Sequence, residues 1–170
     1  MMGSGKTTIG RLLAASTGWP LADNDELLQG FFGMTPRELL ATRGVAALRQ
    51  AEDEALVAGL RLPVPCIVDA AGGTIMSDSS RRLLADNVVV WLRASPPTLF
   101  RRASDAPHRP WLNRGPEWVR QTAAERAPLY ESVADLIVDT DAGSPRESVR
   151  VISAWLGEVA PCAAFLSLAE

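Results

Sequence analysis

The pentapeptide Gly-Ser-Gly-Lys-Thr at residues 3–7 limits the possible folds of this chain more than any other stretch. Apolar residues recur at helical spacing over residues 6–16, directly after it. A glycine-rich turn that opens a helix presents backbone N–H groups to an anion, and the phosphate-binding pattern is G-x-x-x-x-G-K-[ST]. Gly5, Lys6 and Thr7 supply the last three positions. The segment therefore predicts a phosphate-binding loop, which normally connects a buried strand to a helix.

The use of basic residues indicates a specific role for Lys6. The chain has 17 Lys and Arg residues, and Lys6 is the only lysine among them. Lysine is a compact charge on a flexible stem, whereas arginine is a broad planar fork, so a loop wrapped closely around a phosphate has room for lysine. Gly3 and Ser4 add further donors. The alternative, a flexible Gly-Ser tail, does not account for the helical pattern that begins at once.

Helical and strand-like segments alternate along the rest of the chain. Short apolar runs predict strands at 65–70, 88–93 and 136–140, with a weaker candidate near 20–22. Strands that are separated by helices form a mainly parallel sheet covered on both faces. We therefore predict an α/β fold in three layers.

Capping signals and glycines mark the ends of the expected helices. Capping boxes at 35–38 and 144–147 mark two helix starts. Gly18 is expected to end the first helix, and Gly44 to end the helix that begins at the first capping box, with another helix after it. Residues 104–115 contain Pro, Gly, Asn and Asp without periodicity, so an exposed loop is expected there.

Length and charge exclude several classes of protein. A chain of 170 residues suits one compact domain. A net charge of −3 gives no reason to expect a surface for nucleic acid or an anionic membrane. No apolar run approaches the roughly 18 residues of a membrane helix, and the N-terminus lacks the layout of a signal peptide. We therefore expect a cytoplasmic protein, without nucleic-acid or membrane partners.

Three aspartates are candidates for metal or substrate binding. Asp69 ends an apolar strand with Gly72 three residues later, which is the Walker B pattern of a carboxylate that holds Mg²⁺. Asp23 and Asp25 follow the first helix. Side chains at i and i+2 of an extended stretch point the same way, so one could face Mg²⁺ and the other a substrate hydroxyl. A helix cap is the alternative for either aspartate.

With these residues the chain resembles the shikimate kinase family over essentially its whole length. GSGKT alone indicates only a nucleotide, whereas RPWL followed by ERAPLY and a VDT strand is far more specific. The motifs that carry the resemblance are MGSGKTTIGRLLA, Asp23 with Asp25, Arg49 and Glu52 in RGVAALRQAE, Gly72 with Gly73, HRPWL with Arg109, ERAPLY with Arg126, and VDT at 138–140.

The resemblance implies the fold of nucleoside monophosphate kinases, with five parallel strands and a mobile lid. The domain is expected over 1–157, with the lid at about 104–115 and a tail at 158–170. The implied reaction moves the γ-phosphoryl group of ATP to the 3-hydroxyl of shikimate, with Mg²⁺, in aromatic amino acid biosynthesis. A monomer whose partners are small molecules is expected.

The resemblance also implies roles for individual residues. Lys6, Asp25 and Arg109 are the expected catalytic residues, with Asp25 orienting the attacking hydroxyl and Arg109 reaching the phosphates from the lid. The ATP site is expected at Gly3, Ser4, Gly5, Lys6, Thr7, Thr8, Arg102 and Arg109; the acceptor site at Asp25, Arg49, Gly72, Gly73 and Arg126; and the Mg²⁺ site at Thr7, Asp23 and Asp69.

Three positions depart from the family pattern. Ala71 stands where the family usually has a third glycine, and Val45 where it usually has Glu. Asp69 stands where it usually has Ser or Thr, which affects how Mg²⁺ is held. The first two lie in the acceptor half of the site.

Two other functions remain open. One is a kinase of the same fold that acts on gluconate or a nucleoside; Arg49 and Arg126 oppose a neutral acceptor, but gluconate is also a carboxylate. The other is a non-catalytic ligand-sensing domain. Such a domain could lose Lys6, Thr7 or Asp25 without harm, and all three are present.

Only Met1 and Met2 precede Gly3, although a phosphate loop normally follows a strand. We expect the natural chain to begin about eight to ten residues upstream, with a short apolar strand and the loop's first glycine. That strand would lie in the middle of the sheet. Without it, we expect the 170-residue chain to fold poorly and to bind ATP weakly.

Overall fold

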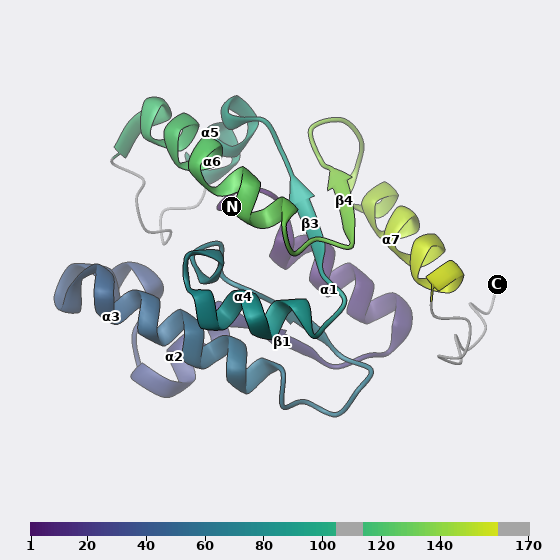
Figure 1. Ribbon diagram of the computed structural model, residues 1–170, viewed down its shortest axis with the longest axis horizontal. Coiled ribbons are helices and arrows are strands. Elements are labelled where there is room, and N and C mark those ends of the chain that lie inside the picture. The colour runs from purple at the N-terminus through teal and green to yellow at the C-terminus, as the bar shows by residue number, and fades with distance from the viewer. Residues whose placement is uncertain (105–113, 160–170) are drawn as a thin grey trace.

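The computed structural model describes residues 1–104 and 114–159 as alternating helices and strands (Figure 1). All four predicted strand segments are confirmed. The elements are α1 (Lys6–Thr17), β1 (Leu21–Asp23), α2 (Asn24–Phe32), α3 (Pro36–Gly59), β2 (Ile67–Asp69), the 3-10 turn η1 (Thr74–Met76), α4 (Asp78–Ala85), β3 (Val90–Arg93), α5 (Pro96–Ser104), α6 (Gly115–Glu131), β4 (Leu136–Asp139) and α7 (Pro145–Val159).

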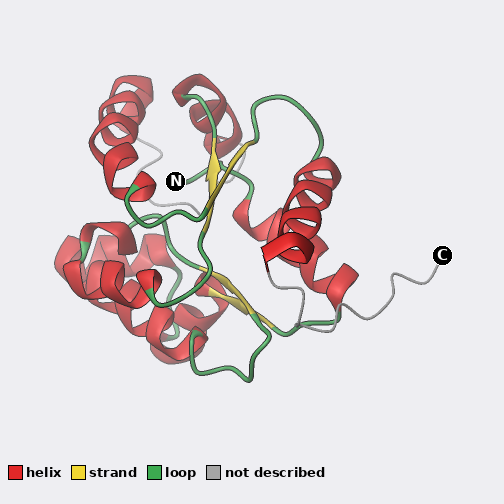
Figure 2. Ribbon diagram, turned by 45° about the vertical axis from the view of Figure 1, so that its right-hand side comes forward, coloured by secondary structure: helices red, strands yellow, loops and turns green. Residues whose placement is uncertain are grey.

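The strands form two parallel pairs with helices packed around them (Figure 2). β1 pairs with β2 from Leu21 opposite Ile67 to Asp23 opposite Asp69. β3 pairs with β4 from 90 opposite 136 to 93 opposite 139. Within the described residues, the two pairs are not hydrogen-bonded to each other. The predicted parallel pairing is confirmed, and it follows from the helical crossovers that separate the strands.

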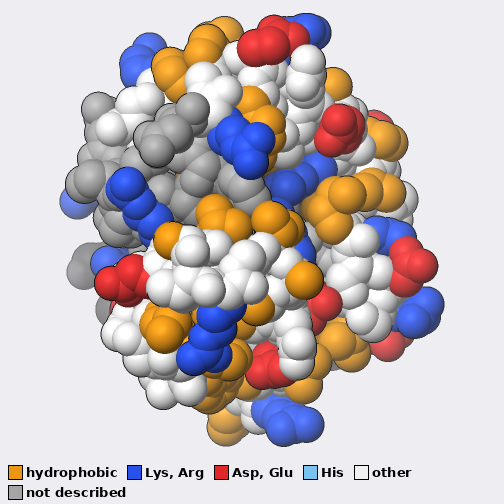
Figure 3. Space-filling model, turned by 90° about the vertical axis from the view of Figure 1, so that its left-hand side faces the viewer, with side chains coloured by type: hydrophobic (Ala, Val, Ile, Leu, Met, Phe, Trp, Pro, Cys, Tyr) orange, Lys and Arg blue, Asp and Glu red, His pale blue; other side chains and the backbone are white. Residues whose placement is uncertain are grey.

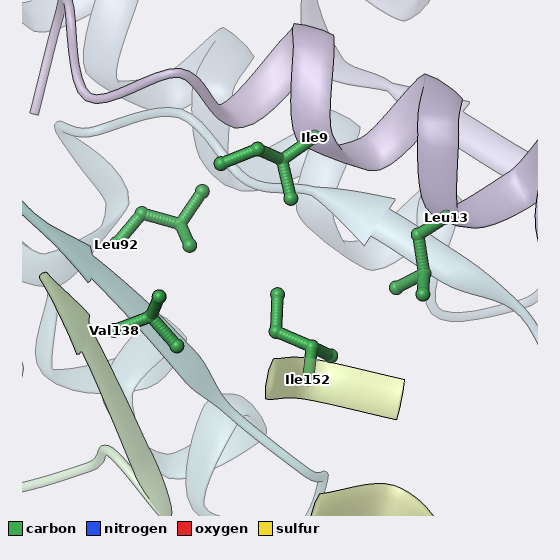
Figure 4. Close-up of a cluster of buried hydrophobic side chains, with 5 residues drawn as sticks. All are labelled: Ile9, Leu13, Leu92, Val138 and Ile152. Carbon is green, nitrogen blue, oxygen red and sulfur yellow. The ribbon is translucent and has the colours of Figure 1, made fainter. Parts of the chain in front are cut away.

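The first hydrophobic core lies between α1, α7 and the second strand pair (Figure 4). Ile9 and Leu13 of α1 face Ile152 of α7, and Leu92 and Val138 come from neighbouring strands. Each of these side chains is at most 9% exposed. The helical spacing of the α1 residues therefore places its apolar face on the sheet, as the sequence pattern predicted.

The second core is formed by α2 and α3. Leu28, Leu39 and Leu48 are at most 1% exposed and pack with the alanines 51 and 55. The capping box predicted at 35–38 starts α3, and Thr35 accepts a hydrogen bond from the N–H of Glu38. At Gly44, φ is 82° and ψ is −178°, so the two helices predicted on either side of it are the two halves of α3.

The other predicted helix ends agree with the structure. Gly18 adopts the left-handed conformation after α1, with φ of 72°. Ser144 and Glu147 exchange the hydrogen bonds of a capping box at the start of α7.

Among 1–104 and 114–159, no helix is both long enough and apolar enough to cross a membrane.

The second core gives a prediction for stability. Leu39→Ala should lower the free energy of unfolding by about 2–5 kcal/mol, because Leu39 is 1% exposed and its truncation leaves a cavity. Val151→Ala on α7, where the valine is 51% exposed, should change it by less than about 0.5 kcal/mol. Urea denaturation of both variants measures the difference, and equal losses would contradict the burial of Leu39.

Candidate active site

Most of the residues that the sequence predicts line one cavity at the carboxyl ends of β1 and β2. This edge of a parallel sheet is where ligands bind in open α/β folds. Figure 3 shows a face of the molecule on which Lys and Arg side chains lie around a hollow. The predicted residues that the cavity brings together are Lys6, Thr7, Asp25, Arg49, Asp69, Gly72, Gly73 and Arg126.

The phosphate loop is held in a conformation that needs its two glycines. Gly3 and Gly5 have φ of 79° and 94°, in the left-handed region. A Cβ on Gly3 would also lie 2.5 Å from the carbonyl oxygen of Leu99. No acidic residue lies in the first turn of α1. The first turn of α1 therefore carries no carboxylate of its own that would compete with an anion for the positive end of the helix dipole.

Donors of this loop converge on one oxygen atom. The Met1 carbonyl oxygen accepts from the Ser4 hydroxyl at 2.9 Å, from the Lys6 ammonium at 3.3 Å and from the Ser4 N–H at 3.4 Å. A backbone carbonyl oxygen and a phosphate oxygen are both hydrogen-bond acceptors. The Ser4 and Lys6 donors therefore lie close together beside the start of α1, and donors of these kinds bind phosphate oxygens.

Thr7 and Asp69 meet beside the loop, as the Walker B pattern predicted. The Thr7 hydroxyl donates to Asp69 Oδ2 at 2.9 Å, and Asp69 is 7% exposed. Burial raises the pKa of Asp69, and the nearby carboxylates Asp23 and Asp25 raise it further, while Lys6 and the Thr7 hydrogen bond lower it. A cation near Asp69 would therefore relieve both the desolvation and the mutual repulsion of these carboxylates.

The site offers oxygen atoms suited to Mg²⁺. Among residues 1–104 and 114–159, no three His, Cys, Asp or Glu side chains gather as a metal cluster. Mg²⁺ in nucleotide sites usually takes only one or two protein ligands, and phosphates and water supply the others. The Thr7 hydroxyl and the Asp69 carboxylate are hard oxygen donors of this kind. The donor set therefore fits Mg²⁺ bound together with a nucleotide.

Asp23 and Asp25 were expected to lie in one extended stretch with side chains that point the same way, and the extended stretch is wrong. The extended strand ends at Asp23, and α2 begins at Asn24, so Asp25 lies in a helical turn. Asp23 Oδ1 instead caps α2 by accepting from the N–H groups of Asp25 at 2.9 Å and Glu26 at 3.4 Å. Asp25 lines the cavity, and its carboxylate accepts from Asn24 Nδ2 at 3.3 Å.

Arg49 and Glu52 form a largely buried ion pair one turn apart on α3. The Glu52 side chain is 8% exposed and that of Arg49 is 25% exposed. Burial raises the pKa of Glu52, although the guanidinium of Arg49 opposes this. Gly73 passes directly over the pair, because a Cβ at Gly73 would overlap both the Arg49 guanidinium and the Glu52 carboxylate. The ion pair with Glu52 therefore holds the Arg49 guanidinium in position.

Arg126 and Tyr130 of α6 hold the loop after β2. Arg126 Nη1 donates to the Gly72 carbonyl oxygen at 2.8 Å, and the Tyr130 hydroxyl donates to the same oxygen at 2.7 Å. The Tyr130 ring stacks on Trp91, with 5.4 Å between the ring centres. Sequence reasoning gave Tyr130 no role. Its spacing of four residues from Arg126 on one helix is the signal that could have found it.

The predicted ATP-site residue Arg102 does not line this cavity within the described residues. Arg102 is held by the residue after β4, since its Nη2 donates to the Thr140 carbonyl oxygen at 2.7 Å. Arg109 and the lid around it fall outside the described residues. Thr8 is exposed on α1 and does not line the cavity within the described part of the chain. Val45, a departure from the family pattern, is 50% exposed.

A profile of the shikimate kinase family matches residues 2–157 of this chain, a span that includes every predicted site residue. The shikimate kinase of Corynebacterium jeikeium is 38% identical over 161 residues, which cover 92% of this chain and 85% of that protein. The shikimate kinase of Moorella thermoacetica is 36% identical over 161 residues, covering 91% of this chain and 92% of that protein.

Solved structures show the same arrangement of elements. The shikimate kinase from Acinetobacter baumannii in complex with shikimate is similar with a TM-score of 0.84 and 27% identity, over 93% of this chain and 90% of that one. The shikimate kinase from Bacteroides thetaiotaomicron has a TM-score of 0.79 and 26% identity, over 91% and 93%. These similarities confirm the predicted fold class.

The close approach of Gly73 to the ion pair gives a second prediction. Gly73→Ala should lower the free energy of unfolding by about 1–3 kcal/mol, because the new methyl group must displace Arg49 or Glu52. The matched control is Gly30→Ala in α2, where an added Cβ meets no atom within 4 Å. That change should stabilise the protein by about 0.5–1 kcal/mol. Urea denaturation compares them, and a neutral Gly73→Ala would contradict this packing.

Proposed function

The chain belongs to the shikimate kinase family, a family of phosphotransferases with an alcohol acceptor, and we propose that it transfers the γ-phosphoryl group of ATP to the 3-hydroxyl of shikimate. One observation carries the proposal: a single cavity combines a phosphate-binding loop with two arginines that are suited to an acceptor carboxylate. The A. baumannii relative is a complex with shikimate, which supports this acceptor.

On the donor side, we propose that residues 3–8 bind the phosphates of ATP through backbone N–H groups and Lys6. Mg²⁺, held by the Thr7 hydroxyl and Asp69 with Asp23 near by, would neutralise charge on the transferring phosphoryl group. The proximity of Thr7 and Asp69, at 2.9 Å, supports this assignment. Arg102 is proposed to lie beside the adenine.

On the acceptor side, we propose that Arg49 and Arg126 bind the carboxylate of shikimate. Planar guanidinium groups match a carboxylate with paired, charge-assisted hydrogen bonds. Each arginine already has a partner that orients it, since Glu52 holds Arg49 and the Gly72 carbonyl holds Arg126. The same contact fixes the Gly72–Gly73 peptide, which adjoins the Gly72 N–H that is proposed to face the substrate.

Catalysis is proposed to rest on position and charge. Phosphoryl transfer passes through a loose transition state, so alignment and neutralisation contribute more than covalent chemistry. Asp25, which lines the same cavity as Arg49 and Arg126, is proposed to orient the attacking hydroxyl and to accept its proton. Lys6 stabilises charge on the phosphates, and Arg109 is proposed to add a further positive charge when the lid closes.

We further propose that residues 1–157 act as one domain, with the lid at about 104–115 and a tail at 158–170. The protein is proposed to work as a cytoplasmic monomer with small-molecule substrates and without nucleic-acid or membrane partners. A profile match that covers residues 2–157 supports the single domain.

The acceptor can be tested directly by coupling ADP release to an optical readout. We expect turnover with shikimate, because the chain belongs to the shikimate kinase family, and little with nucleosides, because the cavity holds two arginines suited to a carboxylate. Gluconate also carries a carboxylate, so the assay compares it directly. Turnover with gluconate instead would favour another carboxylate kinase. Absence of turnover in a folded protein that still binds shikimate would favour a ligand-sensing domain.

The roles of Lys6 and Arg126 give opposite kinetic predictions. Lys6→Ala should lower kcat by about 10²–10³-fold, because it removes a charge that acts on the transition state. Arg126→Ala should raise the KM for shikimate by roughly 10–100-fold, because it removes charge-assisted hydrogen bonds to the bound carboxylate. Steady-state kinetics at varied ATP and shikimate separates these effects, and the reverse pattern would contradict both assignments.

A further inference from the structure

Thr140 connects three segments around the phosphate loop. It follows β4 directly and is 5% exposed. Its hydroxyl oxygen lies 3.2 Å from the carbonyl oxygen of Ser4 and 3.1 Å from that of Arg93. Arg102 donates to the Thr140 hydroxyl at 3.2 Å and to the Thr140 carbonyl oxygen at 2.7 Å. Thr140 thereby joins the loop, the end of β3 and α5.

The Thr140 hydroxyl is expected to donate its proton to the Ser4 carbonyl oxygen rather than to that of Arg93. A hydroxyl has one proton, so it can donate fully to one of the two carbonyl oxygens. The Arg93 carbonyl already accepts the Thr140 N–H at 2.8 Å. Ser4 is only 1% exposed, and an unpaired buried carbonyl is costly. Donation to Ser4 satisfies a buried acceptor, whereas donation to Arg93 would add to a bond that exists.

This hydrogen bond sets the direction of a donor that Thr140 does not touch. The Ser4 carbonyl and the Gly5 N–H belong to one trans peptide, so they point in opposite directions. Fixing the carbonyl at Thr140 therefore directs the Gly5 N–H away from Thr140. Gly5 is the left-handed residue that precedes α1, and N–H groups at this position are phosphate donors.

The helix α5 reaches the same loop a second time. The backbone of Gly3 lies so close to Leu99 that a Cβ would be 2.5 Å from the Leu99 carbonyl oxygen. Arg102 follows Leu99 by three residues, and residues at this spacing share one side of a helix. A displacement of α5 is therefore transmitted to the loop at Gly3 directly and at Ser4 through Thr140.

We propose that Thr140 is a positioning residue for the nucleotide: its hydroxyl holds the Ser4 peptide in the phosphate-binding orientation and couples it to Arg102. The inference rests on the proposed function, because it requires residues 3–8 to bind nucleotide phosphates. Within the described residues, Thr140 does not line the cavity that contains Thr7, Asp69 and the two arginines. Its loss should therefore weaken nucleotide binding and leave shikimate binding unchanged.

The test is calorimetric titration of the Thr140→Val variant with Mg·ADP and, separately, with shikimate. Valine keeps the shape of threonine and removes the hydroxyl. The Kd for Mg·ADP should rise about tenfold, because the Ser4 carbonyl loses its partner and Arg102 loses one of two bonds. Thr140→Ser is the matched control and should stay within about threefold of the unmodified chain. The Kd for shikimate should be the same in all three proteins.

Two outcomes separate this inference from the proposed function. A folded Thr140→Val variant that binds Mg·ADP as tightly as the unmodified chain overturns the role of Thr140 and leaves the kinase assignment intact. An unmodified, folded chain that binds no Mg·ADP overturns the proposed function, and the inference falls with it. An equal loss of shikimate and Mg·ADP affinity would indicate a merely structural residue.

A second variant tests the coupling between Arg102 and the phosphate loop and leaves the Ser4 carbonyl bonded to Thr140. It tests the proposal even if Thr140→Val does not fold. Arg102→Met removes the guanidinium, and inorganic tripolyphosphate serves as a ligand that has no adenine to contact. Its binding should weaken about three- to tenfold, because the loop loses the link to α5 that runs through Thr140. Arg101→Met, at an exposed neighbour on α5, controls for the lost charge. Equal tripolyphosphate affinities in the two variants would overturn the coupling.

Discussion

The packing of α1 across both strand pairs is the constraint on which the rest of the structure depends. The two pairs are not hydrogen-bonded to each other in the described residues, so side-chain contacts must hold them in place. Ile9 and Leu13 fix α1 on β3, β4 and α7, while Thr7 bonds to Asp69 at the end of β2. The phosphate loop opens this same helix. Its position relative to the Asp69 carboxylate is thus set by the hydrophobic core and by the hydrogen bond between Thr7 and Asp69.

Around the cavity, the charged side chains are oriented before a ligand arrives. The guanidinium of Arg49 is paired with Glu52, and that of Arg126 is bonded to the Gly72 carbonyl. A long side chain that is already held loses less conformational freedom on binding, so more of its interaction energy contributes to affinity. The pairing also avoids an isolated charge in a largely buried site, which would be unfavourable. Both arginines of the cavity are therefore held by partners within the protein.

Local signals in the sequence predicted local structure well. The glycine-rich loop, the capping box at 35–38 and the left-handed Gly18 each depend on residues within a few positions, and the structure contains all of them. The extended stretch expected from Asp23 to Asp25 was wrong, because β1 ends at Asp23 and α2 begins at Asn24. Although the spacing of Tyr130 from Arg126 is a local signal, the contacts that Tyr130 and Thr140 make could not be predicted in this way. Their partners, Gly72 and Ser4, are 58 and 136 residues away, so only the folded chain brings them together.

Lys6 differs in chemical reactivity from the other basic side chains of the molecule. Every other basic side chain is a guanidinium, except for one histidine, and guanidinium groups stay protonated and are poor nucleophiles at neutral pH. Lys6 therefore provides the only ε-amine of the molecule, and it lies in the cavity beside the phosphate loop. A reagent selective for lysine side chains would modify one position, at the site itself. Lysine-directed probes can thus be aimed at this protein without a second lysine side chain competing for them.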